Sequence, residues 1–320
     1  MRNVLITGIN GFAGRHLGEH LKKNHYKVYG TTRESNNCAD PSKYVDEMIV
    51  SDLDSKENII ELIKRAKPEV IFHLAAQSNI KESWDHPSST MYANVVKSLF
   101  LFEAVKEISK TIRVINIGSS EEYGHYEGMS FPILEGSPLH PLNPYGASKM
   151  NISILAKQFS ESFDMDIIHL RPFNHIGTGQ IKGFVVPDFA HQIVNIESGL
   201  QEPIISVGNL TSKRDFTDVR DMVMGYLLAA EKGVKGEVYN LCSGKEISIQ
   251  HLLNLMISLS DKSVTVNQDL NKMRPVDIPT YFGSNKKFVE QTGWECCIDI
   301  IQTLEDVLNE IRKRDWKRLT

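Results

Sequence analysis

The chain has 320 residues, of which 41% are hydrophobic and 24% charged, and its formal net charge is −4. These values describe a soluble globular protein that can bury a large core, and they exclude the basic excess of a nucleic-acid-binding surface. No apolar run reaches the ~18 residues of a membrane-spanning helix, and the N-terminus lacks the pattern of a signal peptide. Because the four cysteines (Cys38, Cys242, Cys296 and Cys297) have no metal-binding or redox spacing, we expect reduced thiols in a cytoplasmic protein.

Short apolar strands alternate with helical patterns through the first half of the chain. The strands read NVLITG (3–8), KVYGTT (27–32), VIFHLAA (70–76) and RVINIGS (113–119), and the helical patterns cover 12–23, 56–66, 94–107 and 148–163. This alternation is typical of βαβ units, so it predicts an α/β fold with a Rossmann-type, doubly wound parallel sheet. After residue 170 the strands become irregular, which indicates a smaller α/β substrate-binding lobe. We expect a cofactor domain at 1–170, to which 216–242 returns, and a substrate domain at 171–320.

The first strand runs into a glycine-rich turn, ITGINGFAGRHL (6–17). Gly8 would permit the tight turn, Gly11 the close approach of a pyrophosphate, and Gly14 close packing of helix on strand. The helix that begins at Phe12 and Ala13 would offer its N–H groups and positive dipole to that phosphate. The turn therefore predicts a dinucleotide site, although a plain strand–helix connection can carry the same glycines.

The end of the second strand selects the cofactor. A carboxylate there would bind the adenosine ribose of NAD, but the strand ends in Thr31-Thr32-Arg33. A guanidinium binds a 2′-phosphate bidentately, so Arg33 favours NADP(H). Arg33 can also be a solvated surface arginine, and the use of NAD(H) remains an alternative.

In NPYGASK (143–149), a tyrosine and a lysine stand four residues apart and would share one helix face. Reduction of a ketone leaves an alkoxide that needs a positioned proton donor, and Tyr145 can be that donor. The Lys149 ammonium and an oxidised nicotinamide would lower the pKa of the phenol from ~10. Ser119 follows another strand and would lie at the same sheet edge, so Ser119, Tyr145 and Lys149 are the predicted catalytic set.

Each of these residues has a structural alternative. Tyr145 can simply begin a helix after Pro144, and Ser119 can be a helix N-cap that forms a capping box with Glu122. His73 and His175 follow strands and are interpreted as structural histidines. The carboxylates of Asp215, Asp218 and Asp221 favour a helix N-terminus over a metal site, and no metal is expected.

Six segments in a fixed order, TGINGFAG, HLAAQS, NPYGASK, LRPFNHIG, RDFTDVRD and VYNLCSG, resemble the extended short-chain dehydrogenases/reductases along nearly the whole chain. The resemblance implies that Asp52 and Leu53 contact the adenine and that Ala75 lies beside the cofactor phosphates. It also implies that Lys149 binds the nicotinamide ribose. Such proteins usually form homodimers through two helices, here 94–107 and 148–163.

Segments of the second lobe resemble a smaller group within this family. RPFNHIGTGQ, GFVVPDFA, VGNLTSKRDFTDVRD and MRPVDIP are similar to GDP-6-deoxy-D-mannose reductases, and GDP-mannose 4,6-dehydratases are close relatives. The resemblance implies NAD(P)H-dependent reduction of the C4 ketone of a GDP-linked 4-keto-6-deoxy sugar, and these substrate-binding residues: Ser119, Ser120, Asn174, Val185, Arg214, Arg274 and Asp277. Arg214 and Arg274 can also be ordinary surface arginines, and Asn174 a turn residue. Dehydration through Glu121, 4-epimerisation and cofactor binding without catalysis remain alternatives.

Overall fold

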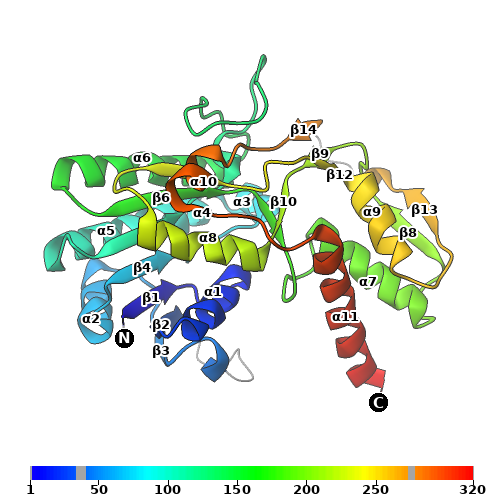
Figure 1. Ribbon diagram of the computed structural model, residues 1–320, viewed down its shortest axis with the longest axis horizontal. Coiled ribbons are helices and arrows are strands. Elements are labelled where there is room, and N and C mark those ends of the chain that lie inside the picture. Colours follow the sequence, from blue (N-terminus) through cyan, green and yellow to red (C-terminus); the bar gives the residue numbers. More distant parts are fainter. Residues whose placement is uncertain (1, 34–40, 273–277, 320) are drawn as a thin grey trace.

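A seven-stranded parallel sheet forms the larger of two lobes in a computed structural model that describes residues 2–33, 41–272 and 278–319 (Figure 1). The strands lie in the order β11-β6-β5-β4-β1-β2-β3. Their bounds are β1 Asn3–Thr7, β2 Lys27–Thr32, β3 Glu47–Val50, β4 Val70–His73, β5 Arg113–Ile117, β6 Ile167–Pro172 and β11 Val238–Leu241. β11 pairs with β6 at one edge, so a late segment of the chain completes the first sheet.

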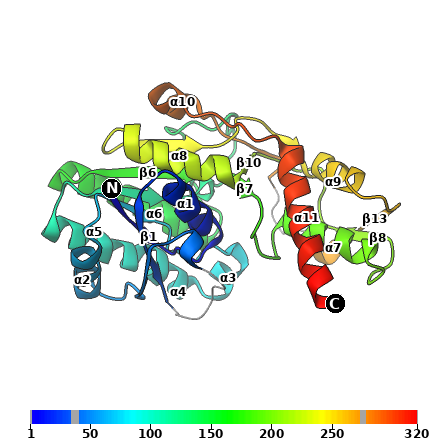
Figure 2. The ribbon, with the colours of Figure 1, turned by 60° about the horizontal axis from the view of Figure 1, so that its bottom comes forward.

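Helices cover both faces of this sheet, as the doubly wound prediction requires. In β1, Val4 and Ile6 enter one buried core and Leu5 enters the other, because successive strand residues point to opposite faces. One core is closed by α1 (Phe12–Lys23), α8 (Val219–Lys232) and α10 (Lys286–Thr292), and Figure 2 shows α8 and α10 along the upper side of the larger lobe. The other is closed by α2 (Lys56–Ala66), α5 (Lys97–Ile108) and α6 (Pro144–Phe163). The predicted fold class is confirmed.

Two predicted helices differ from the structure at their starts. The pattern at 94–107 is part of a longer succession: α3 (Ile80–Asp85), α4 (Pro87–Met91), a π-helical turn η2 (Tyr92–Val96) and then α5. α6 begins at Pro144 rather than at residue 148, because the Asn143 side chain accepts a hydrogen bond from the Gly146 amide and proline suits the first helical position. The earlier start places Tyr145 in the first turn of α6.

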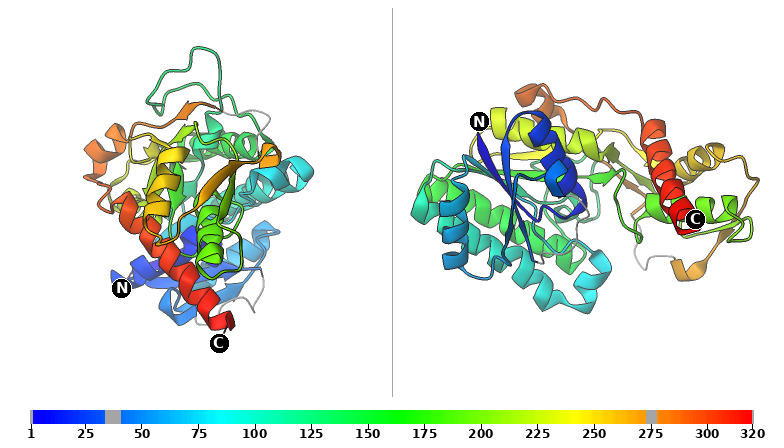
Figure 3. Two further views of the ribbon diagram at one scale, coloured as in Figure 1. Left: turned by 90° about the vertical axis from the view of Figure 1, so that its right-hand side faces the viewer. Right: turned by 90° about the horizontal axis from the view of Figure 1, so that it is seen from below.

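The smaller lobe lies beside the sheet along the long axis of the molecule (Figure 3). Its core joins α7 (Val185–Glu197), α9 (Ile249–Ser258) and α11 (Ile300–Leu319). Its strands form three small sheets: β7 (Asn174–Ile176) with β10 (Phe216–Asp218), β8 (Ile204–Val207) with β13 (Thr265–Gln268), and β12 (Ile247–Ser248), β9 (Lys213–Arg214) and β14 (Thr280–Tyr281). Short 3₁₀ turns are η1 (Pro41–Lys43), η3 (Ser120–Glu122) and η4 (Leu270–Lys272). None of the helices in the described part of the chain has the length and hydropathy needed to span a membrane.

Candidate active site

The glycine-rich turn leaves backbone exposed at the N-terminus of α1. Gly8 has φ +73°, and a Cβ there would lie 2.9 Å from the backbone of Ala75. A Cβ at Gly14 would lie 2.5 Å from the Gly8 carbonyl oxygen, so only glycine allows α1 to approach β1 this closely. Gly11 is the exposed N-cap, and Phe12 and Ala13 begin the helix. This cradle fits the pyrophosphate of a dinucleotide.

The ends of neighbouring strands border the same cradle. The Gly8 amide donates to Thr31 Oγ1 (3.4 Å), and Arg33 directly follows β2 with an exposed side chain. After β3, the Asp52 carboxylate pairs with Lys97 (2.8 Å). Leu53 is buried with φ +57°, so the chain turns sharply at this point. A cation at the end of β2 fits a phosphorylated adenosine ribose.

Ser119, Tyr145 and Lys149 come together at the carboxyl end of β5. The Ser119 side chain lies close enough to the Tyr145 phenol to lower its pKa. Lys149 is buried one turn further along α6, and its ammonium donates to the backbone oxygen of Ile117 (2.7 Å). The predicted meeting of these three side chains at one site is therefore present in the structure.

The sequence analysis predicts that the pKa of Tyr145 is lowered, but in the structure the protein's own residues raise it. Burial raises the pKa of Tyr145, the nearby Ser119 hydroxyl lowers it, and the negative charges of Glu121 and Glu122 raise it further. Burial lowers the pKa of Lys149 to about 8, against the opposite effect of Glu122. The sequence prediction omitted desolvation, which exceeds the effect of a single neighbouring hydroxyl. Tyr145 is consequently a neutral phenol near neutral pH, which is the state of a proton donor.

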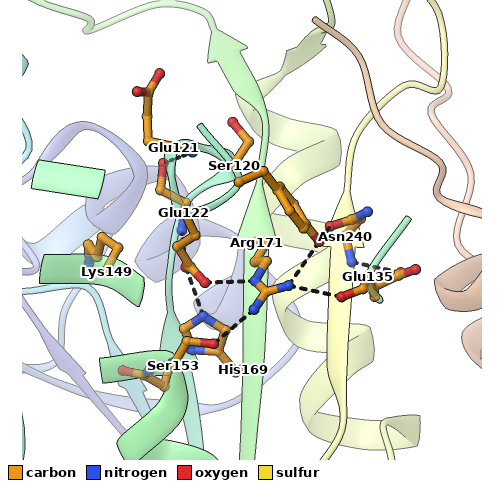
Figure 4. Close-up of polar contacts among 12 residues, drawn as sticks. Ser120, Glu121, Glu122, Glu135, Lys149, Ser153, His169, Arg171 and Asn240 are labelled. Carbon is orange, nitrogen blue, oxygen red and sulfur yellow. Dashed lines mark hydrogen bonds and ion pairs between the residues drawn. The ribbon is translucent and has the colours of Figure 1, made fainter. Parts of the chain in front are cut away.

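The turn from Ser119 to Tyr123 is anchored from several sides. Ser119 is the N-cap of η3, and its capping box with Glu122 is present, so the structural alternative for Ser119 is confirmed beside its contact with Tyr145. The Ser120 carbonyl accepts from the Tyr281 hydroxyl (2.5 Å). Glu121 turns the other way from Glu122 (Figure 4), and its carboxylate accepts from Asn143 Nδ2 (2.8 Å).

Sequence reasoning missed two side chains that hold this region. Asn143 joins the start of α6 to Glu121, as described above. Asn94, fully enclosed within the π-helical turn, exchanges hydrogen bonds with the backbone of Gln77 (2.7 and 2.9 Å) and donates to Ser148 (2.9 Å). π-Turns concentrate at functional sites, but a π-turn has no signature in hydrophobic periodicity. The N-cap role of Asn143 was readable from its place before Pro144.

Three of the predicted substrate residues, Asn174, Val185 and Arg214, lie on the side of the smaller lobe. Asn174 is exposed on β7 and donates to the Asp215 carbonyl (3.1 Å), next to Arg214 on β9. The Arg214 guanidinium donates to the backbone oxygen of Ile278 (2.7 Å). Arg214 also pairs in register with Tyr281, whose hydroxyl donates to the Ser120 carbonyl. These contacts connect β9 and β14 of the smaller lobe to the turn after β5. Val185 begins α7, in the core of the smaller lobe, whereas Arg274 and Asp277 lie outside the described residues.

The histidines and aspartates have structural partners. His73 bonds to Thr7 and Ser98 through its two ring nitrogens (both 2.8 Å), and His175 bonds to the Phe173 carbonyl (3.1 Å) and stacks on Phe12. These contacts agree with the structural interpretation of both rings. Asp218 caps α8, Asp221 accepts from the amides of Cys297 and Ile298, and Asp215 accepts from those of Ser243 and Gly244. Within the described residues, no three metal-binding side chains converge.

A model of the GDP-mannose 4,6 dehydratase family matches residues 5–307. The chain belongs to this family. It is 31% identical over 315 residues to a GDP-6-deoxy-D-mannose reductase of Pseudomonas aeruginosa, with 98% of each chain covered. It is 27% identical to the human GDP-mannose 4,6 dehydratase over 92% of this chain and 87% of that one.

Solved structures agree with this assignment. The structure of RMD from Pseudomonas aeruginosa complexed with NADPH superposes with a TM-score of 0.85 at 30% identity, and 98% of this chain and 99% of that one are covered. A UDP-glucose 4-epimerase from Thermotoga maritima with UDP-glucose gives a TM-score of 0.86 at 26% identity, with 98% and 99% covered. The resemblance to the extended short-chain dehydrogenases/reductases is confirmed, and the chain is an NAD(P)-dependent nucleotide-sugar enzyme of this family.

Proposed function

We propose that the chain reduces the C4 ketone of GDP-4-keto-6-deoxy-D-mannose to GDP-D-rhamnose with NAD(P)H. The observation that carries this choice is the 31% identity to a GDP-6-deoxy-D-mannose reductase along 98% of both chains. Reduction consumes a proton, which the Tyr145 phenol can donate. The experiment is to follow NADPH absorbance when the purified protein meets the keto sugar; rapid loss is expected, and no loss would refute the proposal.

The following catalytic roles are part of this proposal. When bound, the reduced nicotinamide would supply the hydride for the reduction of C4. The Tyr145 hydroxyl donates its proton to the alkoxide that forms at O4, which completes the alcohol. Ser119 is proposed to orient the phenol and the carbonyl oxygen through its hydroxyl, and the Lys149 ammonium is proposed to stabilise the phenolate that remains. Lys149 also binds the nicotinamide ribose in this proposal.

The cofactor is proposed to be NADP(H), and NAD(H) is the alternative cofactor for the same site. Gly8, Gly11, Phe12, Ala13 and Gly14 would hold its pyrophosphate at the start of α1. The Arg33 guanidinium would bind the 2′-phosphate. Asp52 and Leu53 would contact the adenine, and Ala75 would lie beside the phosphates.

The sugar nucleotide is proposed to bind along the smaller lobe. Ser119 and Ser120 would contact the sugar, Asn174 and Arg214 the sugar and pyrophosphate, and Val185 the guanine. Arg274 and Asp277 are proposed to bind a phosphate and a ribose hydroxyl, as the sequence resemblance implies. With these roles, residues 1–170 and 216–242 form the cofactor domain and the rest of 171–320 the substrate domain; the cytoplasmic location remains a prediction.

Dehydration of GDP-mannose is the second candidate, and one observation favours it. Glu121 is a half-buried carboxylate two residues from Ser119, at the place where dehydratases carry their acid–base carboxylate. The Glu121 carboxylate accepts a hydrogen bond from Asn143, whereas abstraction of the C5 proton would require a carboxylate that is free to move. We therefore place reduction first.

A further inference from the structure

We propose that Glu122 is a positioning residue for proton transfer by Tyr145, because its buried carboxylate holds the backbone of Ser119 in the orientation that brings the Ser119 hydroxyl to the phenol. This inference rests on the proposed function, and it adds a residue that touches neither the sugar nor the cofactor. Besides the effect of its charge on the pKa values of Tyr145 and Lys149, Glu122 acts through its hydrogen bond to Ser119.

The carboxylate of Glu122 has no exposed surface, and both of its oxygens are used. Oε1 accepts from the Ser119 amide (2.9 Å) and from His169 Nε2 (2.9 Å), and Oε2 accepts from Arg171 Nε (2.7 Å). Three donors, one at the start of η3 and two on β6, therefore fix one carboxylate. Because Oε1 accepts from the Ser119 amide, the fixed carboxylate also fixes the backbone of Ser119.

The two partners on β6 are themselves fixed. Asn116 Nδ2 lies 2.7 Å from His169 Nδ1, so that nitrogen is an acceptor and Nε2 carries the proton given to Glu122. Arg171 also donates to the Tyr123 hydroxyl (3.0 Å) and to Ser153 Oγ on α6 (3.0 Å). Figure 4 shows Glu122, His169 and Arg171 facing one another while Glu121 points away.

The strand end is shaped to admit this carboxylate. A Cβ at Gly118 would lie 2.1 Å from Glu122 Oε1 and 2.3 Å from His169 Nε2. The residue before Ser119 must therefore lack a side chain for the carboxylate to reach the Ser119 amide. The Ser119 side chain is also held, because its Oγ accepts from the Glu121 amide (3.1 Å). In this position the hydroxyl lies close enough to Tyr145 to lower the pKa of the phenol.

Two double variants test the acceptor at position 122, which serves both Ser119 and His169. In Glu122→Gln/Arg171→Met, the Gln oxygen can still accept from Ser119 and His169, and methionine removes the donor that would oppose the Gln amide. In Glu122→Leu/Arg171→Met, the acceptor is lost and the size and net charge stay close to those of the first variant. Both replace a buried ion pair as a unit, which proteins tolerate far better than the loss of one partner. Asp166→Asn, which breaks the Arg113–Asp166 pair (2.9 Å) at the opposite end of β5 and β6, is the matched control.

We expect kcat for keto-sugar reduction to be about 10- to 100-fold lower in the Leu/Met variant than in the Gln/Met variant, because small misplacements of catalytic groups have effects of this size. KM for the sugar should agree within about threefold, and Asp166→Asn should keep the wild-type kcat. Equal kcat in the two double variants would overturn the inference.

Amide hydrogen exchange at Ser119 separates this result from a failure of the proposed function. Exchange should be fast in the Leu/Met variant and slow in the Gln/Met variant, and equal rates would overturn the inference without any activity measurement. Absence of reduction by the wild-type chain would refute the proposed function instead.

Discussion

His73 should make the folded chain lose stability as the pH falls from 7 to 5. The ring is 3% exposed at the end of β4 and accepts at Nδ1 from Thr7, whose hydroxyl receives the Ala75 amide (3.2 Å). The Ser98 hydroxyl donates to the Asn94 carbonyl (2.7 Å), so Ser98 accepts from Nε2–H of the ring. Both contacts suit a neutral imidazole. Burial, with the nearby charge of Lys149, lowers the pKa of His73 to about 3.

The sign and the size of this change in the free energy of unfolding follow from proton linkage. The unfolded chain binds a proton at this histidine below pH ~6.5, whereas the folded chain does not until about pH 3, so acidification favours unfolding. Between pH 7 and pH 5 the difference amounts to about 2 kcal/mol of the free energy of unfolding.

The variant His73→Gln removes the titration and keeps an amide that can donate and accept in the same pocket. Urea unfolding at pH 7 and pH 5 should show that the wild type loses about 2 kcal/mol more than the variant. Other titrating groups act equally in both proteins and cancel in this comparison. Equal losses in the two proteins would refute the assignment of a neutral, proton-excluding His73.

The remaining predictions concern catalysis, cofactor, substrate and assembly. Tyr145→Phe should reduce kcat by about 10²- to 10⁴-fold and leave NADPH binding unchanged; unchanged turnover would contradict the role of Tyr145. Arg33→Ser should raise KM for NADPH about 10- to 100-fold and leave KM for NADH unaltered, and an equal rise for both would argue against a phosphate contact. GDP should raise the unfolding temperature more than UDP or dTDP at equal concentration, and equal protection would count against guanine recognition. Light scattering should give twice the 36.2 kDa chain mass, falling to one chain in Ile154→Arg on the exposed face of α6; a one-chain mass in the wild type would defeat the homodimer.

Local features of the sequence were sufficient to predict the sheet and the start of the site. Helix bounds at Phe12–Lys23 and Lys56–Ala66 agree with the structure, because a glycine turn and the Ser55 cap mark their starts within a few residues. The spacing of Tyr145 and Lys149, and the position of Ser119 after a strand, needed no tertiary information. The capping box of Ser119 with Glu122 was likewise visible as a four-residue pattern.

What the sequence could not provide depends on distant contacts. The bonds from Glu122 to His169 and Arg171 join residues 47 and 49 positions apart, and nothing in a single sequence pairs them. The raised pKa of Tyr145 arises from burial, which the spacing of two side chains does not report. The π-helical turn around Asn94 was read as regular helix for a similar reason, since its hydrophobic pattern differs little from that of α5.

The most direct test of the reductase proposal is to offer the purified protein two substrates in parallel, GDP-mannose and GDP-4-keto-6-deoxy-D-mannose, each with NADPH. Reduction predicts that NADPH is consumed stoichiometrically with the keto sugar and that GDP-mannose is left unchanged. Formation of a keto sugar from GDP-mannose with no net change in cofactor would contradict the account and assign the chemistry to Glu121.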